Sequence, residues 1–145
     1  MRLMAILALM LVLGAGLGIA YVAYRQMKTD TMTLDGSPQF VQNGDGQLCA
    51  DVDLLVEART LGRWLLPVEE GRTITGVIAV QGDERVDIGL RILSPTNRLT
   101  LMETERKHRH EFQVVAPIRG AYTFEFDNRH STFTEKQLTV SICLA

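Results

Sequence analysis

The segment Gly120-Ala121-Tyr122-Thr123-Phe124-Glu125-Phe126-Asp127 decides the fold class of this chain. Three aromatic residues, Tyr122, Phe124 and Phe126, occupy every second position and alternate with polar residues. Successive side chains of a β-strand point to opposite faces, so the three aromatic rings share one face. The segment therefore predicts a strand with one buried and one polar face.

The same alternation recurs on both sides of this segment. The repeating apolar residues are Ile74, Ile78 and Val80; Ile88, Leu90 and Ile92; Phe112, Val114 and Ala116; and Leu138, Val140 and Ile142. Turn-forming residues separate these runs, for example at 94–97 and 128–131. Short strands at this spacing predict an all-β fold, an antiparallel β-sandwich. Residues 51–59 would suit a strand or a helical turn.

Length and charge limit the classes of function. At 145 residues the chain has room for one domain and an additional segment. The formal net charge is −2. Binding of polyanions depends on an excess of Lys and Arg, so nucleic acid is not an expected partner.

The first residues form an apolar segment. Residues 3–24 contain no charge, and as a helix they would extend about 33 Å, enough to cross a bilayer. We expect residues 1–28 to be a signal anchor of a single-pass protein whose domain lies on the exported side. A cleaved signal peptide, with small residues at 18–20, is the alternative. Gly14 and Gly18 form a G-x-x-x-G pair that would favour a homodimer.

A polar, turn-rich stretch follows the apolar segment. Residues 29–46 contain Asp35-Gly36-Ser37-Pro38 and Asn43-Gly44-Asp45-Gly46, a composition typical of a linker. We therefore expect the folded domain to span residues 47–145.

Just over half of the chain, from Trp64 to Val140, resembles the GOLD (Golgi-dynamics) domain of transmembrane cargo receptors. The matching words, in one collinear order, are Leu66 to Gly76, Asp87-Ile88, Ile92 to Pro95, Phe112 to Pro117, Gly120 to Phe124, Phe126 to Asn128, Ser131, Phe133 and Lys136. The resemblance implies a jelly-roll-like β-sandwich used for protein recognition, without enzymatic activity or a cofactor. Those receptors have a C-terminal membrane helix, whereas the apolar segment here is N-terminal, so their trafficking role is not expected.

The resemblance also implies one contact. Those receptors have a disulfide whose cysteines align near Arg63 and at Glu125, where this chain carries opposite charges. We expect Arg63 and Glu125 to lie on neighbouring strands and to form a cross-strand ion pair. An immunoglobulin-type sandwich is the second fold considered, because Gly120-Ala121-Tyr122 before a strand is typical of a tyrosine corner.

Cys49 and Cys143 lie far apart in the sequence and lack the spacing of a metal or redox motif. They would form a disulfide if the fold brings their Cα atoms within about 7 Å in an oxidising compartment. Two buried free thiols are the alternative.

The most polar stretch is 103–111. His108 and His110 would share a face of a strand and could bind a metal with Glu103 or Glu111. Three of the surrounding residues are basic: Arg106, Lys107 and Arg109. Because these cations would repel a metal ion, a solvated hairpin is the preferred interpretation and no metal site is predicted.

The loop after the aromatic strand is the predicted contact site for a partner. It comprises Asn128, Arg129, His130 and Lys136, although an Asn at this position more often forms a turn. Ser131, His130 and Asp127 have the residue types of a hydrolase triad but lack a nucleophile elbow. No catalytic residue is predicted.

These observations predict a membrane-anchored, non-catalytic binding module with a protein or membrane-associated partner. A structural accessory subunit of a larger membrane complex is the alternative. A metal-dependent enzyme using His108 and His110 is the third hypothesis.

Overall fold

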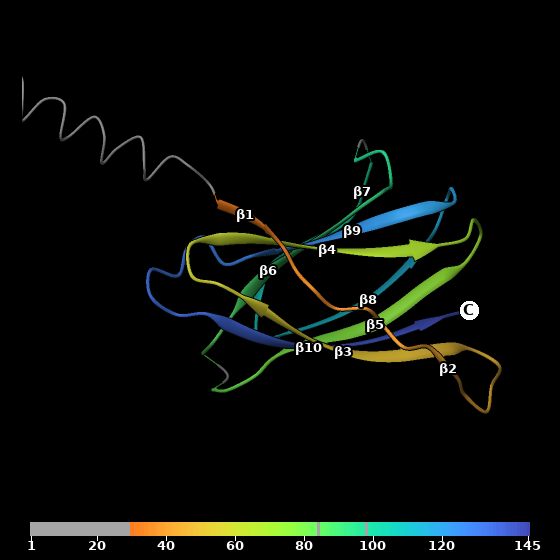
Figure 1. Cartoon of the computed structure of the whole chain (residues 1–145), viewed down its shortest axis with the longest axis horizontal. Helices are drawn as coiled ribbons and strands as arrows, with labels where there is room; N and C mark the ends of the chain where they lie inside the picture. Colours follow the sequence, from red (N-terminus) through yellow and green to blue (C-terminus); the bar gives the residue numbers. More distant parts are fainter. Residues whose placement is uncertain (1–29, 84, 98) are drawn as a thin grey trace, which may run out of the picture.

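The protein is described by a computed structural model that covers residues 30–83, 85–97 and 99–145. The described part forms strands and loops (Figure 1). The strands are β1 (Asp30–Thr33), β2 (Val41–Gln42), β3 (Leu48–Val56), β4 (Thr60–Val68), β5 (Thr73–Val80), β6 (Ile88–Leu93), β7 (Thr100–Lys107), β8 (Arg109–Val115), β9 (Gly120–Asp127) and β10 (Lys136–Leu144).

The strands form two five-stranded sheets that lie face to face (Figure 1). The first sheet has the order β1-β4-β9-β6-β7, and the second has the order β2-β3-β10-β5-β8. All pairs are antiparallel except β1 with β4. The predicted all-β sandwich is therefore confirmed, with one parallel pair at its edge.

Aromatic side chains fill the space between the sheets. Tyr122, Phe124 and Phe126 are fully buried on β9, as the alternation predicts. The ring centroids of Trp64 and Phe124 lie 5.3 Å apart, and those of Phe112 and Phe124 lie 5.6 Å apart. Tilted and edge-on aromatic pairs at this separation add to the stabilisation that burial provides. Phe124 is thus the centre of the core.

The tyrosine-corner contact is present at the start of β9. The Tyr122 hydroxyl donates to the carbonyl oxygen of Ile118 at 2.6 Å. Because a buried hydroxyl needs a partner, this bond fixes the turn that leads into the aromatic strand.

Residues 30–42, which the composition assigned to a linker, belong to the folded unit. They supply β1 and β2, and between them Leu34 enters the core. The indole nitrogen of Trp64 donates to the carbonyl oxygen of Gly36 at 2.6 Å. A Cβ on Gly36 would lie 2.6 Å from a Leu54 methyl, so a larger residue here would have to displace core side chains. The composition of this segment does not reveal these contacts, because Gly36 and Trp64 are far apart in the sequence.

The polar stretch 103–111 is not a solvated hairpin. Strands β7 and β8 run through it but belong to different sheets, and the chain passes between the sheets at His108. His110 consequently faces the interior and is buried. The run of charged residues predicts an exposed segment. In β8, however, alternate residues face the interior, and His110 is one of them.

A disulfide joins Cys49 on β3 to Cys143 on β10. The two residues are direct partners in the antiparallel register, with Cα atoms 4.1 Å apart. This resolves the open choice between a disulfide and two free thiols.

Among the residues that the structure describes, no helix is long and apolar enough to cross a membrane. The expected anchor at residues 3–24, with Gly14 and Gly18, lies outside the described residues.

Candidate functional site

A row of charged residues crosses the outer face of the first sheet. Arg63 on β4 and Arg91 on β6 are both register partners of Glu125 on β9. The Arg63 Nε donates to Glu125 Oε1 at 2.9 Å, and the Arg91 Nε donates to Oε2 at 2.7 Å. The Glu125 side chain is only 1% exposed, whereas those of Arg63 and Arg91 are 47% and 41% exposed. The two guanidinium groups therefore enclose a buried carboxylate.

The predicted pairing of Arg63 with Glu125 is confirmed. Sequence reasoning missed Arg91, although the alternation along β6 places it on the outer face. To predict the contact between Arg91 and Glu125, one must know that β6 lies beside β9. Only the long-range topology of the sheet makes these two strands neighbours.

We expect the two arginines to substitute for each other. Arg63→Ala or Arg91→Ala alone should lower the free energy of unfolding by about 1 kcal/mol, since Glu125 keeps one partner. The double variant should lose about 3 kcal/mol, more than the sum, because the carboxylate is left unpaired. Urea denaturation of the three variants measures this, and strictly additive losses would contradict it.

Arg109→Ala is the matched control for these variants. Arg109 forms an exposed pair with Glu111 on β8, with both side chains more than half exposed. Exposed pairs of this kind contribute little, so the loss should stay below about 0.5 kcal/mol.

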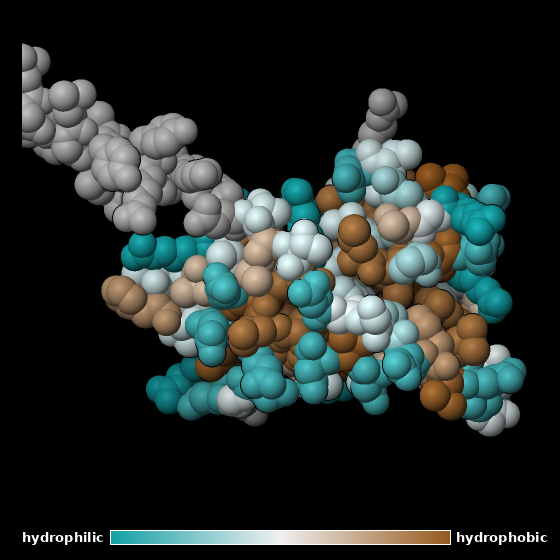
Figure 2. Space-filling view, viewed as in Figure 1, coloured by the Kyte–Doolittle hydropathy of each residue, from teal (hydrophilic) through white to brown (hydrophobic). Residues whose placement is uncertain are grey.

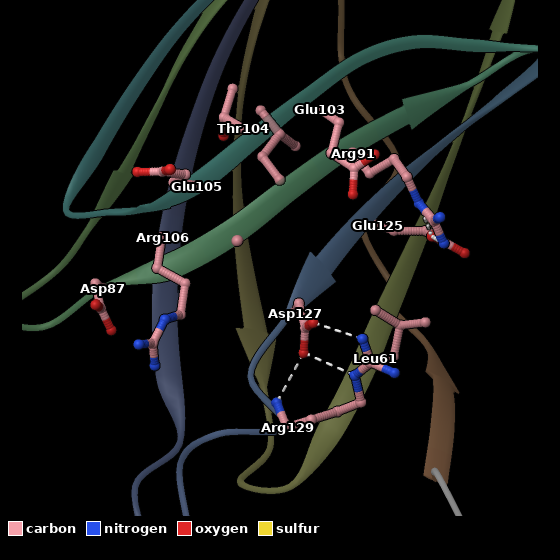
Figure 3. A pocket seen from close by; sticks show the side chains of 12 residues that line it. Leu61, Asp87, Arg91, Glu103, Thr104, Glu105, Arg106, Glu125, Asp127 and Arg129 are labelled. Atoms are coloured by element: carbon pink, nitrogen blue, oxygen red, sulfur yellow. Dashed lines mark hydrogen bonds and ion pairs between the residues drawn. The ribbon is translucent and has the colours of Figure 1, made fainter.

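A groove of about 480 Å³ lies beside this row, over β9, β6 and β7 (Figure 3). Its floor includes Gly89, which pairs with Asp127 across the β6–β9 ladder. A Cβ on Gly89 would lie 3.2 Å from the Cβ of Asp127, so the missing side chain deepens the groove. The lining residues are Leu61, Asp87, Gly89, Leu90, Arg91, Glu103, Thr104, Glu105, Arg106, Glu125, Asp127 and Arg129.

Asp127 and Arg129 form a fixed pair at one end of the groove (Figure 3). The guanidinium of Arg129 donates to both carboxylate oxygens of Asp127, at 2.9 and 2.6 Å. These bonds hold the pKa of the Asp127 carboxyl below its usual range and raise the pKa of Arg129. Both groups are therefore charged at neutral pH.

The other side of the groove carries charges that are open to a ligand. Glu103, Glu105 and Arg106 on β7 are exposed. Within residues 30–83, 85–97 and 99–145 no ion pair involves them. β7 is also the last strand of its sheet, so the groove borders a sheet edge. The arrangement offers charge-assisted hydrogen bonds to groups of both signs.

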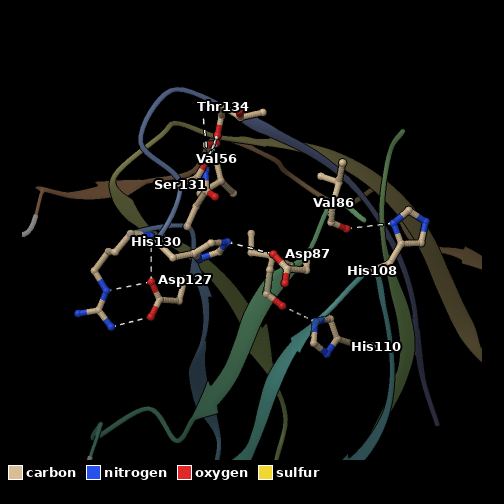
Figure 4. A network of polar contacts seen from close by, with 12 residues as sticks. Val56, Val86, Asp87, His108, His110, Asp127, His130, Ser131 and Thr134 are labelled. Atoms are coloured by element: carbon tan, nitrogen blue, oxygen red, sulfur yellow. Dashed lines mark hydrogen bonds and ion pairs between the residues drawn. The ribbon is translucent and has the colours of Figure 1, made fainter. Parts of the chain in front are cut away.

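Two of the four predicted contact residues lie at this groove. Arg129 lines it, and the Nε2 of His130 lies 3.1 Å from the Oδ1 of Asp87, another lining residue (Figure 4). Both residues are exposed. The structure thus brings Arg129 and His130 together with a site that the sequence did not reveal.

The other two predicted contact residues, Asn128 and Lys136, are buried. The Asn128 amide donates to the carbonyl oxygens of Val56, Glu57 and Thr134, at 3.3, 3.0 and 3.0 Å. Asn128 therefore fixes the β9–β10 loop, the turn-forming alternative that the sequence also offered. Lys136 begins β10 opposite Val56.

The Ser131 hydroxyl has a structural role in the same loop. It donates to the carbonyl oxygen of Thr134 at 2.9 Å, and His130 contacts Asp87 instead. The geometry of the described residues therefore gives Ser131 no activating base.

His108 and His110 contact backbone carbonyls (Figure 4). The His110 Nε2 lies 2.8 Å from the Ile88 carbonyl oxygen, and its Nδ1 lies 2.8 Å from the Thr104 hydroxyl. Burial lowers the pKa of His110, so the ring is neutral at pH 7 and both nitrogens are occupied. In the part of the chain that the structure describes, no three His, Cys, Asp or Glu side chains are grouped to hold a metal ion.

Solved structures with a similar fold include periplasmic inhibitors of g-type lysozyme. The Aeromonas hydrophila inhibitor PliG is 14% identical, with a TM-score of 0.53 over 81% of this chain and 98% of the inhibitor. The Salmonella Typhimurium inhibitor is 12% identical, with a TM-score of 0.48 over 81% of this chain and all of the inhibitor. At such identity the first likeness shows the fold alone.

A comparison with curated proteins finds no match. The family model described as emp24/gp25L/p24 family/GOLD matches residues 66–144, more than half of the chain. This range extends from within β4 to the end of β10 and includes Arg91, Glu125 and the other groove-lining residues except Leu61. The chain therefore belongs to the emp24/gp25L/p24 family, whose model describes the GOLD domain.

Proposed function

We propose that the protein is a non-catalytic module that binds another protein through the groove over β9, β6 and β7. The observation that carries the proposal is the groove itself, which places Glu103, Glu105 and Arg106, exposed and without an ion pair among the described residues, opposite the fixed Asp127–Arg129 pair. Family membership supports a binding role, since the family's GOLD domain suggests a non-catalytic module.

The chemistry of the groove favours a polar segment of a partner protein. Charged groups account for most of its lining, and fixed charges of both signs discriminate between partners. A small apolar ligand would leave these groups unpaired on binding. An extended segment with charges of alternating sign satisfies them, with Arg129 and His130 at its end.

We also propose that residues 3–24 anchor the module in a membrane as a single span, with the domain on the exported side. The disulfide between Cys49 and Cys143 supports export, because disulfides persist in oxidising compartments. Gly14 and Gly18 would permit a homodimer through the anchor.

Photocrosslinking in native membranes tests the binding surface. A photoreactive residue placed at Glu105 of the full chain should capture a partner protein, whereas one placed at Glu111, on the second sheet, should not. Glu103→Lys with Arg106→Glu should lower the yield from position 105 about tenfold, because reversed charges repel the partner. Glu111→Lys is the control. Equal capture at both positions, or a yield that ignores the charge reversal, would overturn the proposal.

A further inference from the structure

The β9–β10 loop presents an exposed aromatic ring. Phe133 is 90% exposed, and the guanidinium carbon of Arg59 in the β3–β4 turn lies 5.9 Å from the ring centroid. A cation over the face of an aromatic ring is attracted to it, so this contact keeps Arg59 beside the exposed Phe133 ring.

The loop that carries Phe133 is fixed on both sides of its tip. Ser131 and Thr134 exchange hydrogen bonds, with the Ser131 hydroxyl donating to the Thr134 carbonyl oxygen at 2.9 Å. The backbone N–H of Arg59 donates to the carbonyl oxygen of Ser131 at 2.9 Å. The buried amide of Asn128 also binds the Thr134 carbonyl oxygen. The fold therefore holds the Phe133 ring outward.

The chain enters the domain at this same end. β1 pairs in parallel with the beginning of β4, and Asp30 is the register partner of Thr60. Arg59 immediately precedes Thr60, so Asp30 lies beside the turn that contacts Phe133. Figure 1 shows β1 beginning at the end of the sandwich where β3 turns into β4 and β9 leads into β10.

Chain length then limits how far this end can be from a bilayer. The charge-free run ends at Tyr24, six residues before Asp30. Even fully extended, six residues span at most about 20 Å. If residues 3–24 span the membrane, the end that carries Phe133 must therefore lie close to its surface.

We infer that the protein stands on the bilayer with the Phe133 end down, the ring inserted at the interface and Arg59 among the lipid headgroups. This inference rests on the proposed membrane anchor. Aromatic rings favour the interfacial region, and an arginine beside the ring can bind headgroup phosphates. The groove on the first sheet is then beside the membrane, and the opposite end of the sandwich is away from it.

Exposed apolar residues at the opposite end provide an internal control. Ile118 is exposed and lies just before Gly120, which pairs with Val68 at the end of β4 opposite to Thr60. Brown, hydrophobic surface is visible at several places on the face shown in Figure 2, so hydrophobicity alone does not select the end that meets lipid. The position of Asp30, where the chain enters the domain, identifies the end that meets lipid.

Quenching by brominated lipids tests the inference. The full chain is placed in nanodiscs of phosphatidylcholine with brominated acyl chains, as the Phe133→Trp variant and as the Ile118→Trp variant. Native Trp64 is buried in the core and supplies a constant background that the unmodified chain measures. We expect the added tryptophan at 133 to lose fluorescence and that at 118 to keep it.

Equal quenching at the two positions, or none at 133 while the chain remains in the nanodiscs, would overturn the inference and leave the anchor intact. Separation of the chain from the nanodiscs would overturn both the anchor and the inference. Thermal unfolding of both variants establishes that they are folded.

Discussion

Phe124→Asp is expected to unfold the domain. Phe124 lies at the centre of the core, in contact with Trp64 and Phe112, and is fully buried. Removing a buried phenyl ring alone costs about 3–5 kcal/mol, and domains of this size are stable by about 5–15 kcal/mol. A carboxylate without a partner in that site adds a further penalty. Circular dichroism and a thermal melt of the purified variant measure the outcome.

Phe133→Asp is the matched control for this substitution. The same two residue types are exchanged, but Phe133 is exposed on its loop, so the free energy of unfolding should change by less than about 0.5 kcal/mol. A cooperative melt of Phe124→Asp near that of the unmodified chain would show that β9 does not bury its aromatic face.

Loss of the disulfide is expected to have the second largest effect. Replacing both Cys49 and Cys143 by serine should lower the free energy of unfolding by about 2–5 kcal/mol. The bond spans a sequence separation of 94 residues, so it removes much of the freedom of the unfolded chain. Denaturant unfolding of the double variant, compared with the oxidised protein, gives the value.

Treating the unmodified protein with a reductant should reproduce this loss, and the same treatment should leave the double serine variant unchanged. An equal stability of the oxidised and reduced protein would mean that the β3–β10 ladder alone holds these strands together.

The sequence predicts the strands well because alternation is a local property. Tyr122, Phe124 and Phe126 are buried as the pattern of β9 requires, and so are the alternating residues of β5, β6, β8 and β10. Only the family resemblance predicted that Arg63 and Glu125 are neighbours, because no local pattern shows which strands are adjacent.

The errors of the sequence analysis arise where long-range contacts override local composition. Residues 30–42 are polar and rich in turn formers, yet Leu34 and Gly36 are held by the core and by Trp64. His110 lies in a run of charges, yet the passage of the chain between the sheets turns it inward. Both outcomes depend on partners distant in sequence.

The groove could not be predicted for the same reason. Its depth depends on Gly89 lying opposite Asp127, and its charges come from β6, β7, β9 and the adjoining loops. The sequence predicts Arg129 and His130 as contact residues because loops at the end of a sandwich are common recognition surfaces, and the structure places both at the groove. Arg91, Glu105 and Arg106 become recognisable only when β9, β6 and β7 are placed side by side.

The structure pairs β3 with β10 through the Cys49–Cys143 disulfide, and we propose that the domain is exported. Mass spectrometry of the protein isolated from membranes, alkylated before digestion and kept unreduced, tests both most directly. The account predicts a peptide pair linked through Cys49 and Cys143, with neither residue alkylated. If both Cys49 and Cys143 were alkylated in the isolated protein, the disulfide between β3 and β10 and the proposed export of the domain would be contradicted.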